Sequence, residues 1–133
     1  MIFLDTNIFL RYFVDDNTEM SKKVEKLFER VVNGNDKYIT SSFVIAEIIW
    51  VLDKFYKWNK KEICENIELL LNTPNVRIQE KGLLMDAISI FKKQNIDFID
   101  AYNYSLMEKN GLSSIYSYDK DFDNFDNIKR LEP

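Results

Sequence analysis

Residues Met1-Ile2-Phe3-Leu4-Asp5 form a short apolar run that ends at an acid. Such a run is typical of a strand in a parallel sheet, because these sheets are covered by helices on both faces. The prediction places Asp5 at the carboxyl end of a buried strand. In open α/β sheets, ligands bind at this end of the strands, near the point where the strand order reverses. Asp5 is therefore the first candidate for a functional residue.

Helices and strands alternate along the rest of the chain. Amphipathic stripes, caps and breakers predict helices at 6–14, 18–33, 43–57, 60–72, 83–93 and 98–110. Asn17 or Thr18 is expected to cap the second helix, and Ser41 or Ser42 the third. Short apolar runs predict further strands at 37–40, 76–78, 114–118 and 128–131. This alternation predicts one α/β domain over 1–133, with a mainly parallel central sheet of four or five strands and helices on both faces.

The composition is typical of a globular domain in a reducing compartment. The length of 133 residues suits one hydrophobic core, and the single cysteine, Cys64, excludes an internal disulfide. No apolar run reaches the roughly 20 residues that a bilayer requires, and no basic stretch precedes the first apolar run. We therefore expect a cytoplasmic protein without a membrane span.

The absence of histidine limits the chemistry that the chain can perform. With no histidine in the sequence, catalytic triads and histidine-based acid and base catalysis are excluded. Carboxylates, lysines, a bound metal or Cys64 would have to handle protons and charge. The net charge of −4 argues against a protein that coats nucleic acid by general attraction. An acidic site that binds metal ions could nevertheless face a phosphodiester, because the ions reverse the local field.

Glu47 is the most informative single acid in the sequence. It carries the only charge in Phe-Val-Ile-Ala-Glu-Ile-Ile-Trp-Val-Leu, residues 43–52. A carboxylate buried in so apolar a helix is costly unless it is paired, protonated or bound to a cation. A buried ion pair with a lysine or arginine is the alternative interpretation. The sequence thus predicts a buried Glu47 with a positive partner.

Three more acids are expected at the same edge of the sheet as functional candidates. Asp5 and Asp119 each follow a predicted strand, and Asp100 lies one turn into the helix that Asp97 is expected to cap. Each has a simpler interpretation: an N-cap for Asp5, favourable interaction with its helix dipole for Asp100, and a solvated turn for Asp119. Their convergence favours a hard cation such as Mg²⁺ or Mn²⁺, which prefers oxygen ligands.

Four short motifs make the whole chain similar to a known family. They are Ile2-Phe3-Leu4-Asp5-Thr6-Asn7, Val44-Ile45-Ala46-Glu47, Asp97-Phe98-Ile99-Asp100-Ala101 and Ser117-Tyr118-Asp119-Lys120-Asp121-Phe122. In order and spacing they resemble the PIN-domain nucleases, and among these the VapC-type toxins of toxin–antitoxin pairs. The resemblance implies a PIN fold and a metal-dependent ribonuclease that uses Mg²⁺ or Mn²⁺. It also implies an RNA substrate, a cognate antitoxin and a homodimer.

The resemblance also assigns residue roles. It implies that the metal-binding and catalytic acids are Asp5, Glu47, Asp100 and Asp119, with Asp121 as an occasional further ligand. Thr6, Asn7 and Ser117 match positions that support such sites by hydrogen bonding, although helix capping and strand-end polarity are the other interpretation. Ser117 stands where the family often has threonine, which keeps the hydroxyl. We interpret Asp97 as a cap or a support for a ligand.

Two rival functions belong to other classes. A phosphoacceptor receiver domain is also a small α/β protein with an acidic, magnesium-binding pocket, but it requires an aspartate after the central strand. The predicted third strand here continues as Gln79-Glu80. A non-catalytic interaction module that keeps the PIN fold is the second rival. With three glycines in the chain, no Gly-rich phosphate loop is available to a nucleotide-binding domain.

Overall fold

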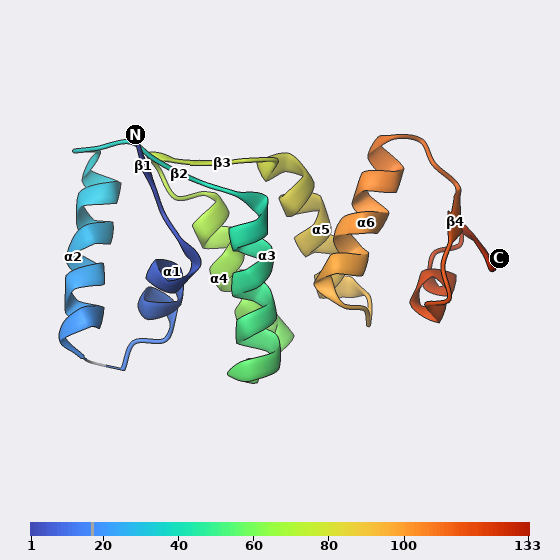
Figure 1. Cartoon of the computed structure of the whole chain (residues 1–133), viewed down its shortest axis with the longest axis horizontal. Helices are drawn as coiled ribbons and strands as arrows, with labels where there is room; N and C mark the ends of the chain where they lie inside the picture. Colours follow the sequence, from blue (N-terminus) through green and yellow to red (C-terminus); the bar gives the residue numbers. More distant parts are fainter. Residues whose placement is uncertain (17) are drawn as a thin grey trace. The chain divides into compact units, whose positions relative to one another are not determined.

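A computed structural model describes residues 1–16 and 18–133. The chain divides into two compact units, unit 1 (Met1–Lys81) and unit 2 (Gly82–Pro133), and each unit is described by itself. Figure 1 shows the elements along the chain. Asn17, one of the two residues expected to cap the second helix, lies outside the described residues.

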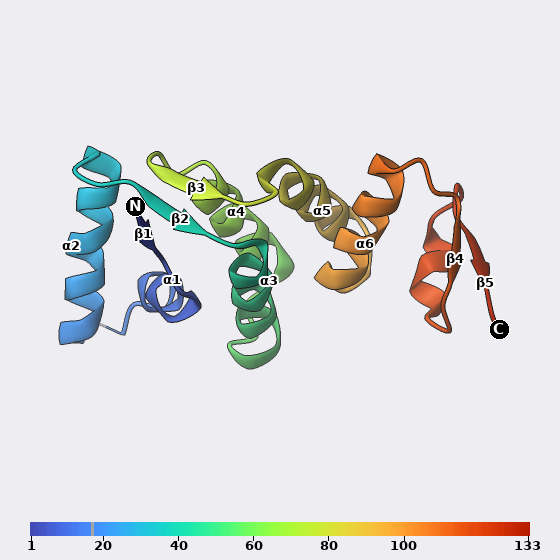
Figure 2. The same cartoon turned by 45° about the horizontal axis from the view of Figure 1, so that its top comes forward.

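Unit 1 contains a three-stranded parallel sheet. Its strands are β1 (Ile2–Phe3), β2 (Tyr38–Thr40) and β3 (Val76–Ile78), in the order β1-β2-β3. Figure 2 shows the three strands side by side. The connecting helices are α1 (Thr6–Phe13), α2 (Glu19–Asn33), α3 (Ser42–Trp50) and α4 (Lys60–Leu71). A π-helical turn, η1 (Val51–Phe55), continues α3 and accounts for most of the expected extension of this helix to 57.

Local side-chain chemistry sets the ends of these helices. The Oγ1 atom of Thr18 accepts a hydrogen bond from the backbone N–H of Ser21, so Thr18 caps α2 as predicted. Gly34 ends the same helix with a φ of 78°, a left-handed conformation that suits glycine. Ser41 caps α3 by accepting from the N–H of Val44.

The core of unit 1 packs the helices against the sheet. Its fully buried side chains include Phe9, Tyr38, Ile45, Ile48, Leu52, Ile63, Ile67 and Leu71. The buried Thr40 hydroxyl donates to the Leu4 carbonyl at 2.8 Å, which fixes the end of β1 against β2. β1 is the edge strand, and its Ile2 and Phe3 side chains are about half exposed, so the expectation of a buried strand is met only at Leu4.

Unit 2 contains the remaining two strands and two long helices. Its elements are α5 (Lys81–Lys93, which starts at the last residue of unit 1), α6 (Phe98–Lys109), β4 (Ser114–Tyr116), the 3₁₀ turn η2 (Lys120–Asn124) and β5 (Lys129–Leu131). β4 and β5 pair in parallel. The rings of Tyr104 and Phe125 stack with centroids 3.7 Å apart, which ties α6 to the segment that follows η2.

The predicted α/β class with parallel strands is confirmed. All five predicted strands and all six predicted helices form, with bounds that differ from the prediction by a few residues. Within the described residues, the strands belong to a three-stranded and a two-stranded sheet. None of the described helices is both long enough and apolar enough to cross a bilayer.

Candidate functional site

Three acids of unit 2 converge at one place. Asp100 lies in the first turn of α6, Asp119 follows the end of β4, and Asp121 belongs to η2. One carboxylate oxygen from each of the three lies within 4.8 Å of the others. Asp100 and Asp121 are partly buried and Asp119 is exposed. The structure therefore brings together three of the five acids that the sequence singled out.

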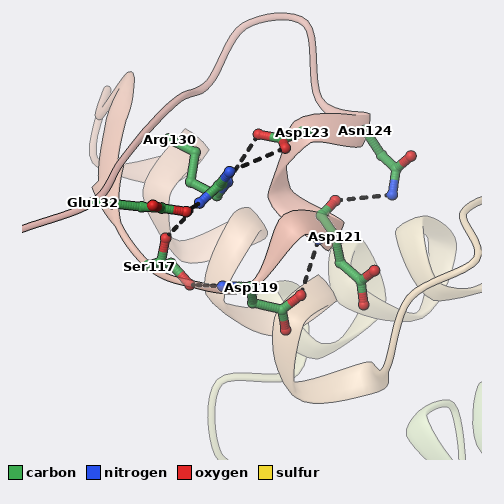
Figure 3. A network of polar contacts seen from close by, with 7 residues as sticks. All are labelled: Ser117, Asp119, Asp121, Asp123, Asn124, Arg130 and Glu132. Carbon is green, nitrogen blue, oxygen red and sulfur yellow. Dashed lines mark hydrogen bonds and ion pairs between the residues drawn. The ribbon is translucent and has the colours of Figure 1, made fainter.

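Short-range hydrogen bonds shape the segment that holds two of these acids (Figure 3). The Ser117 hydroxyl accepts from the backbone N–H of Asp119 at 2.9 Å. The Asp119 carboxylate in turn accepts from the N–H of Asp121 at 2.9 Å, and so caps η2. The amide of Asn124 donates to the Asp121 carbonyl. The Ser117 hydroxyl therefore binds a backbone group two residues away, a contact that both interpretations of Ser117 allow.

The three carboxylates influence one another electrostatically. Partial burial and the charges of Asp119, Asp121 and Asp97 raise the pKa of Asp100 from 3.8 to about 6. A hydrogen bond with the Asp119 carboxyl also favours the protonated form of Asp100. Near neutral pH the three carboxylates therefore repel one another, and binding of a proton or a cation would reduce this repulsion.

The donor set of this cluster fits a hard metal ion. Carboxylate oxygens are the ligands that Mg²⁺ and Mn²⁺ prefer. Oxygens bound at about 2.1 Å to one octahedral ion lie roughly 3 to 4 Å apart, so oxygens within 4.8 Å need only a small adjustment. Repulsion among the carboxylates, seen in the raised pKa of Asp100, is what such an ion would neutralise.

Asp5 lies in unit 1 and caps a helix. One of its carboxylate oxygens accepts from the N–H of Thr6 at 2.8 Å, at the N-terminus of α1. One carboxylate oxygen of Asp5 therefore takes the N-cap role that the simpler interpretation gave to this residue. The Thr6 hydroxyl is buried without a hydrogen-bond partner among the described residues, and Asn7 is exposed on the same helix.

Glu47 is exposed on α3, which corrects the expectation of a buried acid. Phe43, Glu47 and Trp50 recur at the spacing of one helix face, and all three are exposed. Ile45, Ile48 and Ile49 take the opposite face into the core of unit 1. The residues next to Glu47 in sequence are apolar, but they do not surround its side chain in unit 1. The argument for a bound cation that relied on a buried Glu47 therefore does not hold.

Asp97 occupies the N-cap position of α6, as predicted, with extended backbone angles. Its side chain does not make the capping hydrogen bond. Its charge instead contributes to the raised pKa of Asp100. Asp97 therefore acts on the cluster electrostatically.

Sequence reasoning missed the basic residue of this region. Arg130, in β5, donates to the Asp123 carboxylate from Nε at 3.0 Å, to Glu132 at 2.6 Å, and to the Ser117 carbonyl at 2.9 Å (Figure 3). Its partners follow from the way β5 returns beside β4, which no short motif encodes. The sequence signal that could have indicated this role was the presence of Arg130 shortly after Asp119, Asp121 and Asp123.

Comparison with known proteins decides the classification. Residues 2–128 match the family model described as PIN domain. The chain belongs to the PIN domain family. The match includes residues of both units of this PIN domain protein. It confirms the family that the four motifs indicated.

One curated relative and one similar solved structure carry VapC names. The PIN domain chain is 27% identical over 122 residues to a "VapC ribonuclease" of Aquifex aeolicus (strain VF5), an alignment that covers 92% of this chain and 90% of the relative. The resemblance to VapC-type toxins is thereby supported by a protein that carries that name. Among solved structures, the chain is similar to the Mycobacterium tuberculosis toxin VapC20, titled a Sarcin-Ricin loop cleaving toxin. That similarity has a TM-score of 0.43 and 18% identity, over 93% of this chain and 94% of that one.

Proposed function

We propose that this PIN domain protein is a metal-dependent ribonuclease and the toxin component of a type II toxin–antitoxin system. The convergence of Asp100, Asp119 and Asp121 is the observation that carries this proposal, because it supplies the oxygen ligands that such a nuclease needs. The relative named "VapC ribonuclease" supports the choice of RNA as substrate.

The proposal assigns the catalytic and metal-binding roles to Asp5, Glu47, Asp100 and Asp119, with Asp121 as a further ligand. The family match over residues 2–128 supports one PIN domain over 1–133.

The carboxylates have distinct chemical tasks in this proposal. When bound, an Mg²⁺ or Mn²⁺ ion would supply an activated water and neutralise charge that develops on the phosphate. Asp119 and Asp121 would hold the ion together with Asp100, and the hydroxyl of Ser117 would keep Asp119 oriented. In the metal-free protein the pKa of Asp100 is raised to about 6, so a proton competes with the ion for this carboxyl as the pH falls below neutral.

The proposed partners follow from the same assignment. RNA is the substrate, a cognate antitoxin binds and inhibits the protein, and the protein acts in the cytoplasm as a homodimer. The net charge of −4 is compatible with this assignment only if phosphate binding is local and assisted by metal. Thr6, Asn7 and Asp97 support the ligands rather than bind metal.

An RNA cleavage assay tests the proposed function. Purified protein is incubated with a mixture of structured RNAs and Mn²⁺, with and without excess chelator. We expect cleavage that requires the ion and that disappears in Asp119→Asn. Asp86→Asn is the matched control, because Asp86 is an exposed aspartate on α5 of the same unit. Cleavage that persists with chelator or in Asp119→Asn would refute the proposal.

A further inference from the structure

Arg130 is a cation of unit 2 that contacts several acceptors at once. Only 13% of its side chain is exposed, although it is the middle residue of the short strand β5. Its guanidinium donates through Nε and Nη2 to the two oxygens of Asp123, at 3.0 and 3.4 Å. Through Nη1 it donates to the Ser117 carbonyl at 2.9 Å and to Glu132 at 2.6 Å. A single side chain thus contacts three separate points of the chain.

Two of these points bracket the segment that contains Asp119 and Asp121. Ser117 stands before this segment and Asp123 follows it, so Arg130 holds the segment at both ends (Figure 3). Between these ends, the hydrogen bonds from Asp119 N to Ser117 Oγ and from Asp121 N to Asp119 Oδ1 continue the same path. The position of both carboxylates therefore depends on where the ends of the segment are held.

Arg130 also separates the acids of this region by role. Asp119, Asp121 and Asp123 alternate in sequence and could compete for the same cation. The guanidinium pairs with Asp123 and Glu132, while Asp119 and Asp121 lie with Asp100 in the three-carboxylate cluster. Positive charge held on the far side of the segment leaves Asp119 and Asp121 to bind a metal.

We propose that Arg130 is a positioning residue that ties Ser117 to Asp123 and so holds Asp119 and Asp121 beside Asp100. This inference rests on the proposed function, because it concerns the acids assigned there to metal binding. A planar guanidinium can serve a carboxylate through two N–H groups while a third reaches a carbonyl. An ammonium group at the same place is a point charge and cannot span these acceptors in fixed directions. The geometry therefore requires arginine and not merely a positive charge.

Two variants test the inference without touching a proposed ligand. Arg130→Lys keeps the charge and removes the fork, and Asp123→Asn keeps the shape and removes the charge pair. Arg77→Lys is the matched control, because Arg77 is an exposed arginine on a strand of unit 1. Circular dichroism and thermal melts establish that each variant is folded. If Arg130→Lys fails to fold, the milder Asp123→Asn decides.

Manganese affinity, hydrogen exchange and RNA cleavage are the readouts. We expect the Mn²⁺ dissociation constant from calorimetry to rise about 10-fold in both variants, the usual size for the loss of a group that orients a metal ligand. The amides of Asp119 and Asp121 should exchange faster, and cleavage at low Mn²⁺ should fall and recover at high Mn²⁺. A loss of stability alone would lower activity at all Mn²⁺ concentrations alike, and would contradict the inference.

Asp119→Asn in the same calorimetry separates this inference from the proposed function. If wild type binds Mn²⁺ no more tightly than Asp119→Asn, the proposed function fails. If Asp119→Asn loses affinity but Arg130→Lys and Asp123→Asn match wild type in affinity and exchange, only the role of Arg130 is refuted.

Discussion

Replacing Asp100 by asparagine should stabilise the metal-free protein. Burial and the neighbouring aspartates raise the pKa of Asp100 from 3.8 to about 6, so the folded state binds this proton more tightly than the unfolded state. The resulting stabilisation is fully present below pH 3.8 and is lost as the pH rises through about 6. Asparagine is neutral at every pH, so Asp100→Asn avoids the charge repulsion that wild type has at pH 7.

The magnitude follows from the pKa shift after allowance for solvent. A rise of about two pKa units corresponds to roughly 3 kcal/mol for a fully buried group. Asp100 is only partly buried, and screening by water reduces the gain to about 1 kcal/mol. With an unfolding entropy typical of a chain of 133 residues, this gain raises Tm by about 3 to 4 °C.

Differential scanning calorimetry between pH 4 and 8, in chelator, measures this effect. The difference in Tm between Asp100→Asn and wild type should be near zero at pH 4 and reach its full value above pH 7. Mn²⁺ at about 100 times its dissociation constant should add roughly 2.7 kcal/mol to wild type but little to the variant. The reasoning is refuted if Asp100→Asn melts below wild type at pH 7, or if its gain is independent of pH and equals that of Asp86→Asn.

Three further outcomes are expected. Lowering the pH from 7 to 5 should weaken Mn²⁺ binding about 10-fold in calorimetry, because a proton then competes for Asp100, whose pKa is about 6. Asn75 has a φ of 66° and donates to the Val31 carbonyl; Asn75→Ala should cost about 2 kcal/mol in urea unfolding and Asn75→Gly about half of that, since glycine tolerates the backbone angle. Thr40→Val, which removes the hydroxyl that donates to Leu4, should cost about 1 to 2 kcal/mol in the same measurement.

Features set by near neighbours in sequence were predictable. Thr18, Ser41 and Gly34 bound their helices as expected, because capping involves residues within one turn of the chain. Short apolar runs likewise located the strands β1 to β5. The cluster of Asp100 with Asp119 was predicted because acids at strand ends and helix starts face the same edge of an α/β fold.

Features that depend on which face of an element is packed were not predictable. The residues around Glu47 are apolar on all sides in sequence, yet α3 directs Phe43 and Glu47 away from the core of unit 1. The partners of Arg130 depend on the pairing of β5 with β4, and its sequence neighbours give no indication of them. Local pattern therefore located the acids, while tertiary structure determined their surroundings.

The central claim is that the protein is a metal-dependent ribonuclease whose activity requires both Asp5 and Asp119. The most direct measurement is the rate of RNA cleavage at saturating Mn²⁺ for Asp5→Asn, from unit 1, and Asp119→Asn, from unit 2, against wild type and Asp86→Asn. We predict that both variants lose at least 100-fold in rate, the upper range for disturbed metal sites, while Asp86→Asn retains the wild-type rate. A wild-type rate in either Asp5→Asn or Asp119→Asn would contradict this claim.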